Sequence, residues 1–284
     1  MVHIKKIGIL TLCILFSLAQ SAQGVELGLK IAGGLSFLNP SDVNRILQDR
    51  VEWQMRDIAA HENWTFLSAK EPQIKRGVEF EGELVFSLGS RFALSLGTGF
   101  IYSDLKSTGT EVRVQKPLGE TILVQPHTLS ALPIMMFGYA RFPFSRMFSV
   151  YVKGGAGFLW AKYVERYGTK RVENKKFNYL RDESSSAQSL TYVGGMGFFL
   201  ETEPGIRFFL EGTYRWAKVS DFEGETNKDV MGPLYYYEEY DFGFWQAKMR
   251  VHDQEPSGEN IRSVKKAEVD FSGLSIKLGI MIRF

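Results

Sequence analysis

The sequence predicts an all-β fold, an eight-stranded antiparallel up-and-down transmembrane β-barrel with long extracellular loops. Two observations predict it. Apolar and polar residues alternate with a period of two along eight segments, and short connections between these segments alternate strictly with long ones. Side chains of a strand point alternately to its two faces, so each segment has one apolar and one polar face.

The alternation is clearest in the second segment, where Val78 and Phe80 alternate with Glu79 and Glu81. In the fourth segment both faces are apolar, and Pro133 weakens the strand prediction unless the proline lies at a bulge. The predicted strands cover residues 25–37, 77–88, 91–103, 128–142, 148–161, 189–201, 206–217 and 268–284.

Connection lengths predict how the barrel is oriented. Three connections have turn compositions, whereas the others are long: 38–76, 104–127, 162–188 and 218–267. Successive connections of an up-and-down barrel lie at opposite ends, so all short turns share one end. Short periplasmic turns and long external loops are typical of outer-membrane barrels.

Residue size predicts which face is inside. The apolar faces carry bulky residues, whereas the polar faces combine charged residues with very small ones such as Gly97, Gly99, Gly155 and Gly157. An eight-stranded barrel is just wide enough to be filled by side chains, so the small and charged faces suit its interior. A soluble barrel or sandwich with the faces reversed is the alternative.

The first residues predict a signal peptide over residues 1–24, followed by the barrel domain over 25–284. Lys5 and Lys6 precede an apolar stretch that is too short to span a bilayer, and cleavage after Ser21 or Gly24 fits the small residues there. An uncleaved anchor or a short buried helix is the alternative reading. Cys13 is the only cysteine, so the exported chain is expected to have none.

The last strand ends on an aromatic residue after an alternating run, and Leu278, Ile280, Ile282 and Phe284 carry the pattern. It resembles the signal by which insertion machinery recognises outer-membrane barrels. Residues 132–136 and 150–157 are similar to the central hairpin of the outer membrane protein beta-barrel domain family, and the whole architecture resembles small barrels of the OmpA/OmpX type. The resemblance implies a Gram-negative-type outer membrane, with membrane lipid, lipopolysaccharide and the insertion machinery as partners.

Charged residues on the polar faces predict a network inside the barrel. Isolated buried charges are costly, so these residues are expected to pair with one another. We expect the network to be structural, with rearrangement into a narrow pore as the alternative. It comprises Lys30, Glu79, Glu81, Glu83, Lys153, Glu211, Arg215 and Lys277.

The sequence contains only weak candidates for a catalytic group of residues. His127 and Ser130 lie three residues apart, on opposite faces of a strand, and His252 follows Glu238 and Asp241 in a loop. We therefore expect no enzyme, no cofactor and no metal site, since Cys/His metal spacing is absent. A net charge of +2 also excludes a typical nucleic-acid binder.

The long loops predict three further features. Residues 41–58 show helical spacing after a possible cap at Ser41-Asp42, which predicts an amphipathic helix over the barrel mouth or on the membrane. A Tyr- and Trp-rich segment, 235–245, predicts a β-hairpin or a contact surface. Contact with lipopolysaccharide phosphates is predicted for Arg166, Lys170, Arg171, Lys175 and Lys176.

For function we expect a non-enzymatic surface or structural protein of the envelope whose loops contact an extracellular ligand. A narrow channel for small or hydrophobic solutes is the alternative, and a lipid A-modifying enzyme is less favoured.

Overall fold

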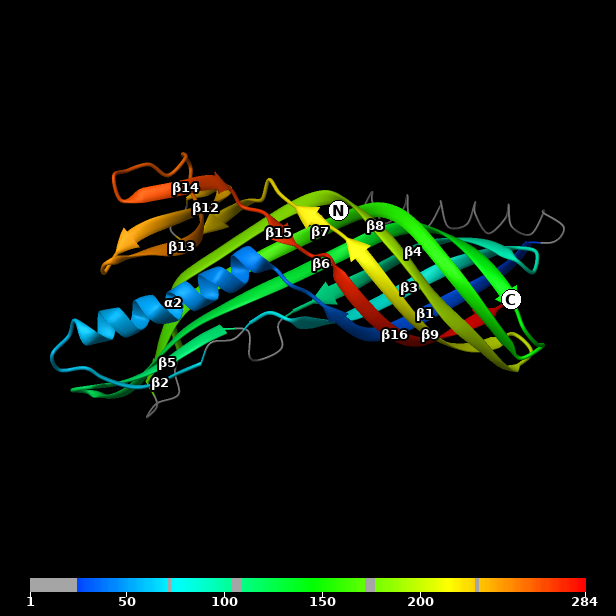
Figure 1. The fold of residues 1–284 in the computed structure, drawn as a ribbon, viewed down its shortest axis with the longest axis horizontal. Helices are drawn as coiled ribbons and strands as arrows, with labels where there is room; N and C mark the ends of the chain where they lie inside the picture. Colours follow the sequence, from blue (N-terminus) through cyan, green and yellow to red (C-terminus); the bar gives the residue numbers. More distant parts are fainter. Residues whose placement is uncertain (1–24, 71–72, 104–108, 172–176, 228–229) are drawn as a thin grey trace.

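The structure is a computed structural model that describes residues 25–70, 73–103, 109–171, 177–227 and 230–284. The predicted signal peptide lies outside the described residues. The molecule is elongated: long inclined strands form one end, and a helix with further strands lies at the other (Figure 1). Among the described residues, no helix combines the length and apolar character needed to cross a bilayer.

Eight antiparallel strands pair in sequence order, and the last pairs with the first, so the pairings close a ring. Each of the eight predicted segments contributes one strand of this ring. The strands are β1 (Val25–Phe37), β3 (Arg76–Leu88), β4 (Phe92–Tyr102), β6 (Gly119–Pro143), β7 (Phe148–Arg171), β8 (Phe177–Glu203), β9 (Ile206–Trp216) and β16 (Gly273–Arg283).

The other elements lie at the end of the ring that carries the long connections, and we call them, with the outer parts of β6, β7 and β8, the extension. They are α2 (Ser41–Ala59), β2 (Thr65–Lys70), β5 (Gly109–Lys116), β10 (Lys218–Val219), β11 (Glu223–Thr226), β12 (Met231–Asp241), β13 (Phe244–Val251), β14 (Ile261–Lys266) and β15 (Val269–Asp270). The β12–β13 pair confirms the hairpin predicted from the Tyr- and Trp-rich segment.

The prediction that residues 104–127 and 162–188 are loops was wrong for most of their described residues. There β6, β7 and β8 continue as strands well past the predicted boundaries, and β5 pairs with β6. Apolar residues of α2 cover one side of β5 and of the outer part of β6: Val51 and Ile58 pack with Val112, Val114 and Leu123. The helix supplies the second layer that a two-faced sheet needs to bury its apolar side.

Predicted strand 268–284 is also shorter than expected. The ring strand begins at Gly273, and β15 before it pairs separately with β10.

The amphipathic helix predicted in the first long connection is confirmed as α2, but the predicted Ser41-Asp42 cap was wrong. The helix begins at Ser41 after Pro40, and no side chain caps it. The carboxylate of Asp42 instead accepts a hydrogen bond from Lys265 Nζ at 2.9 Å, which ties the helix start to β14.

The two faces of the ring are the inverse of those of a soluble barrel. Lys30 and Glu211 are 1% and 0% exposed inside the ring, whereas Phe80 and Met136 are 58% and 68% exposed outside it. The stripe of small and charged residues therefore faces the interior, as residue size predicts, and the alternative with the faces reversed was wrong.

Pro133 fits the ring at an interruption of one ladder. The pairing of β6 with β4 runs to Thr98↔Ile134 and resumes at Ile101↔Ala131, while the pairing with β7 continues in register through Pro133↔Leu159. The side chain of Thr98 donates a hydrogen bond to the Pro133 carbonyl at 3.0 Å. A strand tolerates proline where its missing N–H is not needed by the ladder.

Candidate functional site

The strand register places the predicted interior charges opposite one another. Lys30 on β1 lies directly across from Glu83 on β3, and Lys277 on β16 lies directly across from Glu211 on β9. Cross-strand neighbours on one face are close enough for their side chains to interact. The ladder alone therefore builds two of the ion pairs: Lys30 Nζ lies 2.7 Å from Glu83 Oε1, and Lys277 Nζ lies 3.2 Å from Glu211 Oε1.

Other pairs cross the interior of the ring. Lys153 stands on β7, and its Nζ lies 3.0 Å from Glu81 Oε1 and 3.1 Å from Glu83 Oε1 on β3, although β4 and β6 separate the two strands. Lys30 Nζ likewise lies 2.7 Å from Glu211 Oε2. The first two contacts reach across the ring, and the third spans the single strand β16.

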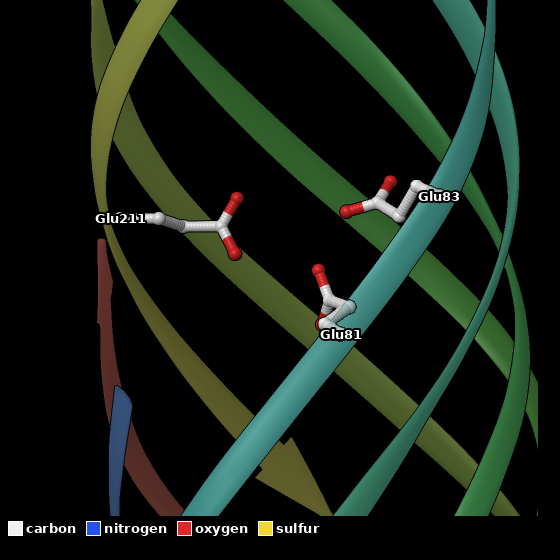
Figure 2. A group of neighbouring side chains, drawn as sticks. All are labelled: Glu81, Glu83 and Glu211. Atoms are coloured by element: carbon white, nitrogen blue, oxygen red, sulfur yellow. The ribbon is translucent and has the colours of Figure 1, made fainter. Parts of the chain in front are cut away.

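Three carboxylates form the centre of the cluster. Figure 2 shows Glu81 and Glu83 on one strand pointing inward toward Glu211 on the facing wall, and one oxygen of each lies within 4.8 Å of the others. Such a set could offer oxygen ligands to a metal ion, but the ammonium groups of Lys30, Lys153 and Lys277 contact these oxygens. The arrangement is chemically an ion-pair cluster.

Hydroxyl groups that the sequence analysis missed add hydrogen bonds to the cluster. Ser95 Oγ donates to Glu83 Oε2 at 2.5 Å, and Tyr139 OH donates to the same oxygen. Tyr151 OH donates to Glu211 Oε2 at 2.8 Å. These residues occupy inward-facing positions in the two-residue alternation of their strands, and this sequence signal could have identified them.

A second layer lies toward the extension. Arg215 Nη1 donates to Glu79 Oε2 at 3.1 Å, and Ser275 Oγ donates to the same oxygen at 2.7 Å. The predicted network is thus brought together as a whole: three lysines and one arginine (+4) against four glutamates (−4) give zero net charge. Buried charges persist in proteins when they are paired and hydrogen-bonded in this way.

Apolar layers cover this cluster on both sides. Toward the short turns the interior is filled by a group that includes Tyr151, Phe199 and Phe209. Toward the extension, residues of ring strands such as Leu129 and Leu159 pack with Val43 and Leu47 of α2 and with residues of β12 and β13. The first half of α2 therefore lies over the mouth of the ring, one of its two predicted positions.

The extension contains a buried polar group that sequence analysis missed, because the segments that hold it were predicted to be loops. Glu165 on β7 faces Glu183 on β8 in register, and the two residues are 4% and 1% exposed. Burial, together with the facing Glu165, raises the pKa of the Glu183 carboxyl to about 7. Arg181 lies against Glu183, and Gln125 Nε2 donates to Glu165 Oε1 at 2.5 Å.

The residue pairs that the sequence analysis considered as catalytic candidates do not come together in the structure. His127 is buried and its Nδ1 lies 2.8 Å from Tyr163 OH, whereas Ser130 is on the other face of β6. In the extension, His252 Nε2 lies 3.3 Å from Tyr237 OH, and Glu238 instead accepts a hydrogen bond from Arg262 Nε at 2.7 Å.

The remaining predicted residues lie on the outside of the molecule or beyond the described chain. Arg166 is exposed on β7 and forms an ion pair of 3.1 Å with Asp182. Lys170 and the backbone of Arg171 lie near the end of β7, and Lys175 and Lys176 lie outside the described residues. Among the predicted insertion-signal residues, Leu278 and Ile280 on β16 and Phe284 directly after it are exposed. Ile282 on β16 is partly buried.

Comparisons with known proteins bear on this architecture. Residues 8–252 match the outer membrane protein beta-barrel domain family. No curated protein matches the chain. Among solved structures, the chain is similar to the outer membrane protein OprG from Pseudomonas aeruginosa, with 10% identity, 90% of this chain and 95% of that chain covered, and a TM-score of 0.40.

It is also similar to the outer membrane protease OmpT from Escherichia coli, with 6% identity, 92% and 95% of the two chains covered, and a TM-score of 0.27. The RagAB peptide transporter gives 8% identity and a TM-score of 0.21, and the similarity covers 87% of this chain but 39% of that one. Because the family match extends over most of its length, the chain belongs to the outer membrane protein beta-barrel domain family and resides in the outer membrane.

Proposed function

We propose that the chain is an eight-stranded transmembrane barrel with a closed lumen, which acts without catalysis as a surface protein and presents its extension to an extracellular partner. The observation that carries the proposal is the inverted ring, in which paired charges fill the interior and large apolar side chains cover the outside. An apolar outer band is what a barrel presents to lipid.

Aromatic residues support the membrane position. Outward side chains gather at the short-turn end of the ring, among them Phe92, Phe142 and Phe208, which are 59%, 52% and 46% exposed. Trp160 and Trp216 are 41% and 53% exposed at the other end. Transmembrane barrels carry such girdles at both interfaces, so the band between them would lie in the hydrocarbon.

Closure of the lumen follows from its filling. The ion-pair cluster spans the ring from wall to wall, and an aromatic layer and α2 lie on its two sides. A channel would require Lys30, Lys153 and Lys277 to leave three carboxylates together, which costs several kcal/mol in a poorly hydrated interior, by the order of magnitude for unpaired buried charges.

Planar-bilayer conductance tests closure. The full chain and a Glu83→Ala variant are reconstituted, with an open porin as the positive control for insertion and detection. We expect near-zero conductance from both, because the aromatic layer remains in the variant. Steady conductance by the unmodified chain would overturn the closed-lumen proposal and favour a narrow solute channel.

A membrane requirement is tested separately. The purified chain is transferred from detergent micelles into plain buffer, and its state is followed by light scattering. We expect aggregation, because the outward apolar residues lose their cover. A folded monomer in buffer would overturn the transmembrane proposal.

A specific observation supports lipopolysaccharide as one partner. Lys162 is exposed on the outer face of β7, two residues beyond Trp160 on the same face, and Arg166 follows at the next but one outward position. Cations just outside an aromatic girdle would lie at the height of lipid phosphates. We expect Lys162→Gln with Arg166→Gln to weaken binding of lipopolysaccharide to the chain in micelles. Lys70→Gln, at an exposed position of β2 that follows no girdle tryptophan, serves as the control. Equal binding by all three proteins would contradict this contact.

A further inference from the structure

A second polar site lies at the opposite end of the ring, around the short turns. A cavity of about 320 Å³ opens there, many times the roughly 10–15 Å³ that one water needs. Its lining includes Arg141, Arg146, Arg207 and Arg283. We call this cavity the arginine vestibule.

The vestibule carries an excess of positive charge. Two carboxylates, Glu26 and Glu201, also line it, so its four arginines and two glutamates give +4 − 2 = +2. Arg207 Nε lies 2.9 Å from Glu201 Oε2, and Arg283 pairs with both carboxylates. Within the described residues, Arg141 and Arg146 form no ion pair with a carboxylate, so the excess lies with them.

Arg141 is buried and fixed by one hydrogen bond, and two of its nitrogen donors are left without a hydrogen-bond partner in the part of the chain that the structure describes. Its side chain is 5% exposed, and Nη1 donates to Ser87 Oγ at 3.1 Å. Its Nε and Nη2 are buried and have no hydrogen-bond partner among the described residues, and the same holds for Nε of Arg283. Leaving buried donors of a charged group unsatisfied costs free energy, which a bound acceptor would recover.

Two of the guanidinium groups, those of Arg141 and Arg207, lie near the same aromatic ring. The guanidinium carbons of Arg141 and Arg207 each lie 5.8 Å from the centroid of the Phe199 ring, which forms part of the cavity wall. A guanidinium presents a planar fork of donors that matches two oxygens of a phosphate or carboxylate. An excess of two positive charges favours phosphate, which carries more charge and more acceptor oxygens than a carboxylate.

We propose that the arginine vestibule binds a phosphate group, with the free donors of Arg141 as its central contact. The phosphate could come from solution or from the headgroup of an anionic phospholipid. Exposed apolar side chains at the same turn, Phe144 and Met147, would suit the lipid, since they are 72% and 57% exposed beside the cavity. The lipid source rests on the proposed membrane position, whereas the phosphate site itself does not.

The test uses the full chain refolded in lipid-free maltoside micelles. One arm titrates inorganic phosphate by calorimetry. The other adds phosphatidylglycerol, or diacylglycerol as the phosphate-free control, and counts retained lipid by native mass spectrometry. We expect saturable binding of phosphate or selective retention of phosphatidylglycerol, and the arm that responds identifies the source.

Variants connect binding to the site. Arg141→Met is expected to weaken binding about tenfold or more, since a hydrogen bond to a charged group contributes roughly 1.5–3 kcal/mol. Arg207→Gln tests the opposite wall and keeps the proposal testable if the first variant fails to fold. Arg91→Gln removes an exposed charge at the same rim outside the vestibule and should bind like the unmodified chain. Absence of binding in both arms, or unchanged binding by Arg141→Met and Arg207→Gln, would overturn the proposal.

Discussion

Lys153 on β7 and Glu211 on β9 form an ion pair, with 2.9 Å between Nζ and Oε1, although β8 lies between their strands. The side chains meet because both point into the ring, where Lys153 is 4% and Glu211 0% exposed. Contacts of this kind, between strands that are not neighbours, join the cross-strand ion pairs into one cluster. They also make the ring depend on residues far apart in the sequence.

Lys153→Met is expected to destabilise the protein by about 3–5 kcal/mol, the usual cost of removing one partner of a buried ion pair. Glu81, Glu83 and Glu211 each lose one counter-charge. Guanidinium unfolding in micelles measures the effect. Lys162→Met, on the outer face of the same strand, is the control and should change stability by a small fraction of that amount. Equal losses in the two variants would contradict the role of the cluster.

Gly157→Ala is expected to destabilise the β6–β7 pair by about 1–3 kcal/mol through overpacking. A Cβ at Gly157 would lie 2.0 Å from the Ile134 carbonyl oxygen, so the backbone would have to move. At Gly154, on the outer face, a Cβ meets nothing within 4 Å. Gly154→Ala is therefore the matched control in the same unfolding measurement, and similar behaviour of the two variants would argue against the close strand approach.

Stability of the extension is expected to fall as pH rises from about 5 to 8. The pKa of Glu183 is raised from 4.5 to about 7 by burial and by the facing Glu165. The folded state therefore holds a proton more tightly than the unfolded state between these values, and it loses this advantage as the carboxyl ionises. Thermal unfolding followed by near-ultraviolet circular dichroism at pH 5 and pH 8 measures the change.

A glutamine variant of Glu183 tests whether its carboxyl causes this pH dependence of stability. Glu183→Gln should reduce the fall and be more stable than the unmodified chain at pH 8. Glu225→Gln changes an exposed carboxyl on neighbouring β11 and should keep the full pH dependence. If Glu183→Gln kept it as well, another group would have to be responsible.

Leu47→Ala is expected to loosen the extension while leaving the ring paired. Leu47 is 0% exposed between α2 and the ring mouth, and truncation of such a residue costs about 2–5 kcal/mol. Limited proteolysis should cut the extension of this variant faster. Met55→Ala, at a position of the same helix that is 42% exposed, should match the unmodified chain. Equal cutting rates for both variants would contradict the packing role of Leu47.

The ring strands, the inward stripe and α2 could all be predicted from the amino-acid sequence. Each follows from a local period: two residues for a strand such as β3, and the helical spacing of Val43, Leu47 and Val51. The alternation of residues along each strand was also sufficient to predict which charged side chains form the interior cluster. Local periodicity carries this information because it records which face of an element is covered.

Where the strands end and which side chains meet depends instead on contacts between segments far apart in the chain. Residues 162–171 continue β7 because α2, more than a hundred residues earlier, covers their inner side, and no local pattern encodes that cover. The same holds for Tyr139 at Glu83 and for Glu183 opposite Glu165, whose register depends on how whole strands pair. Long-range packing sets these relationships, because the free energy that fixes them is gained only when distant segments come together.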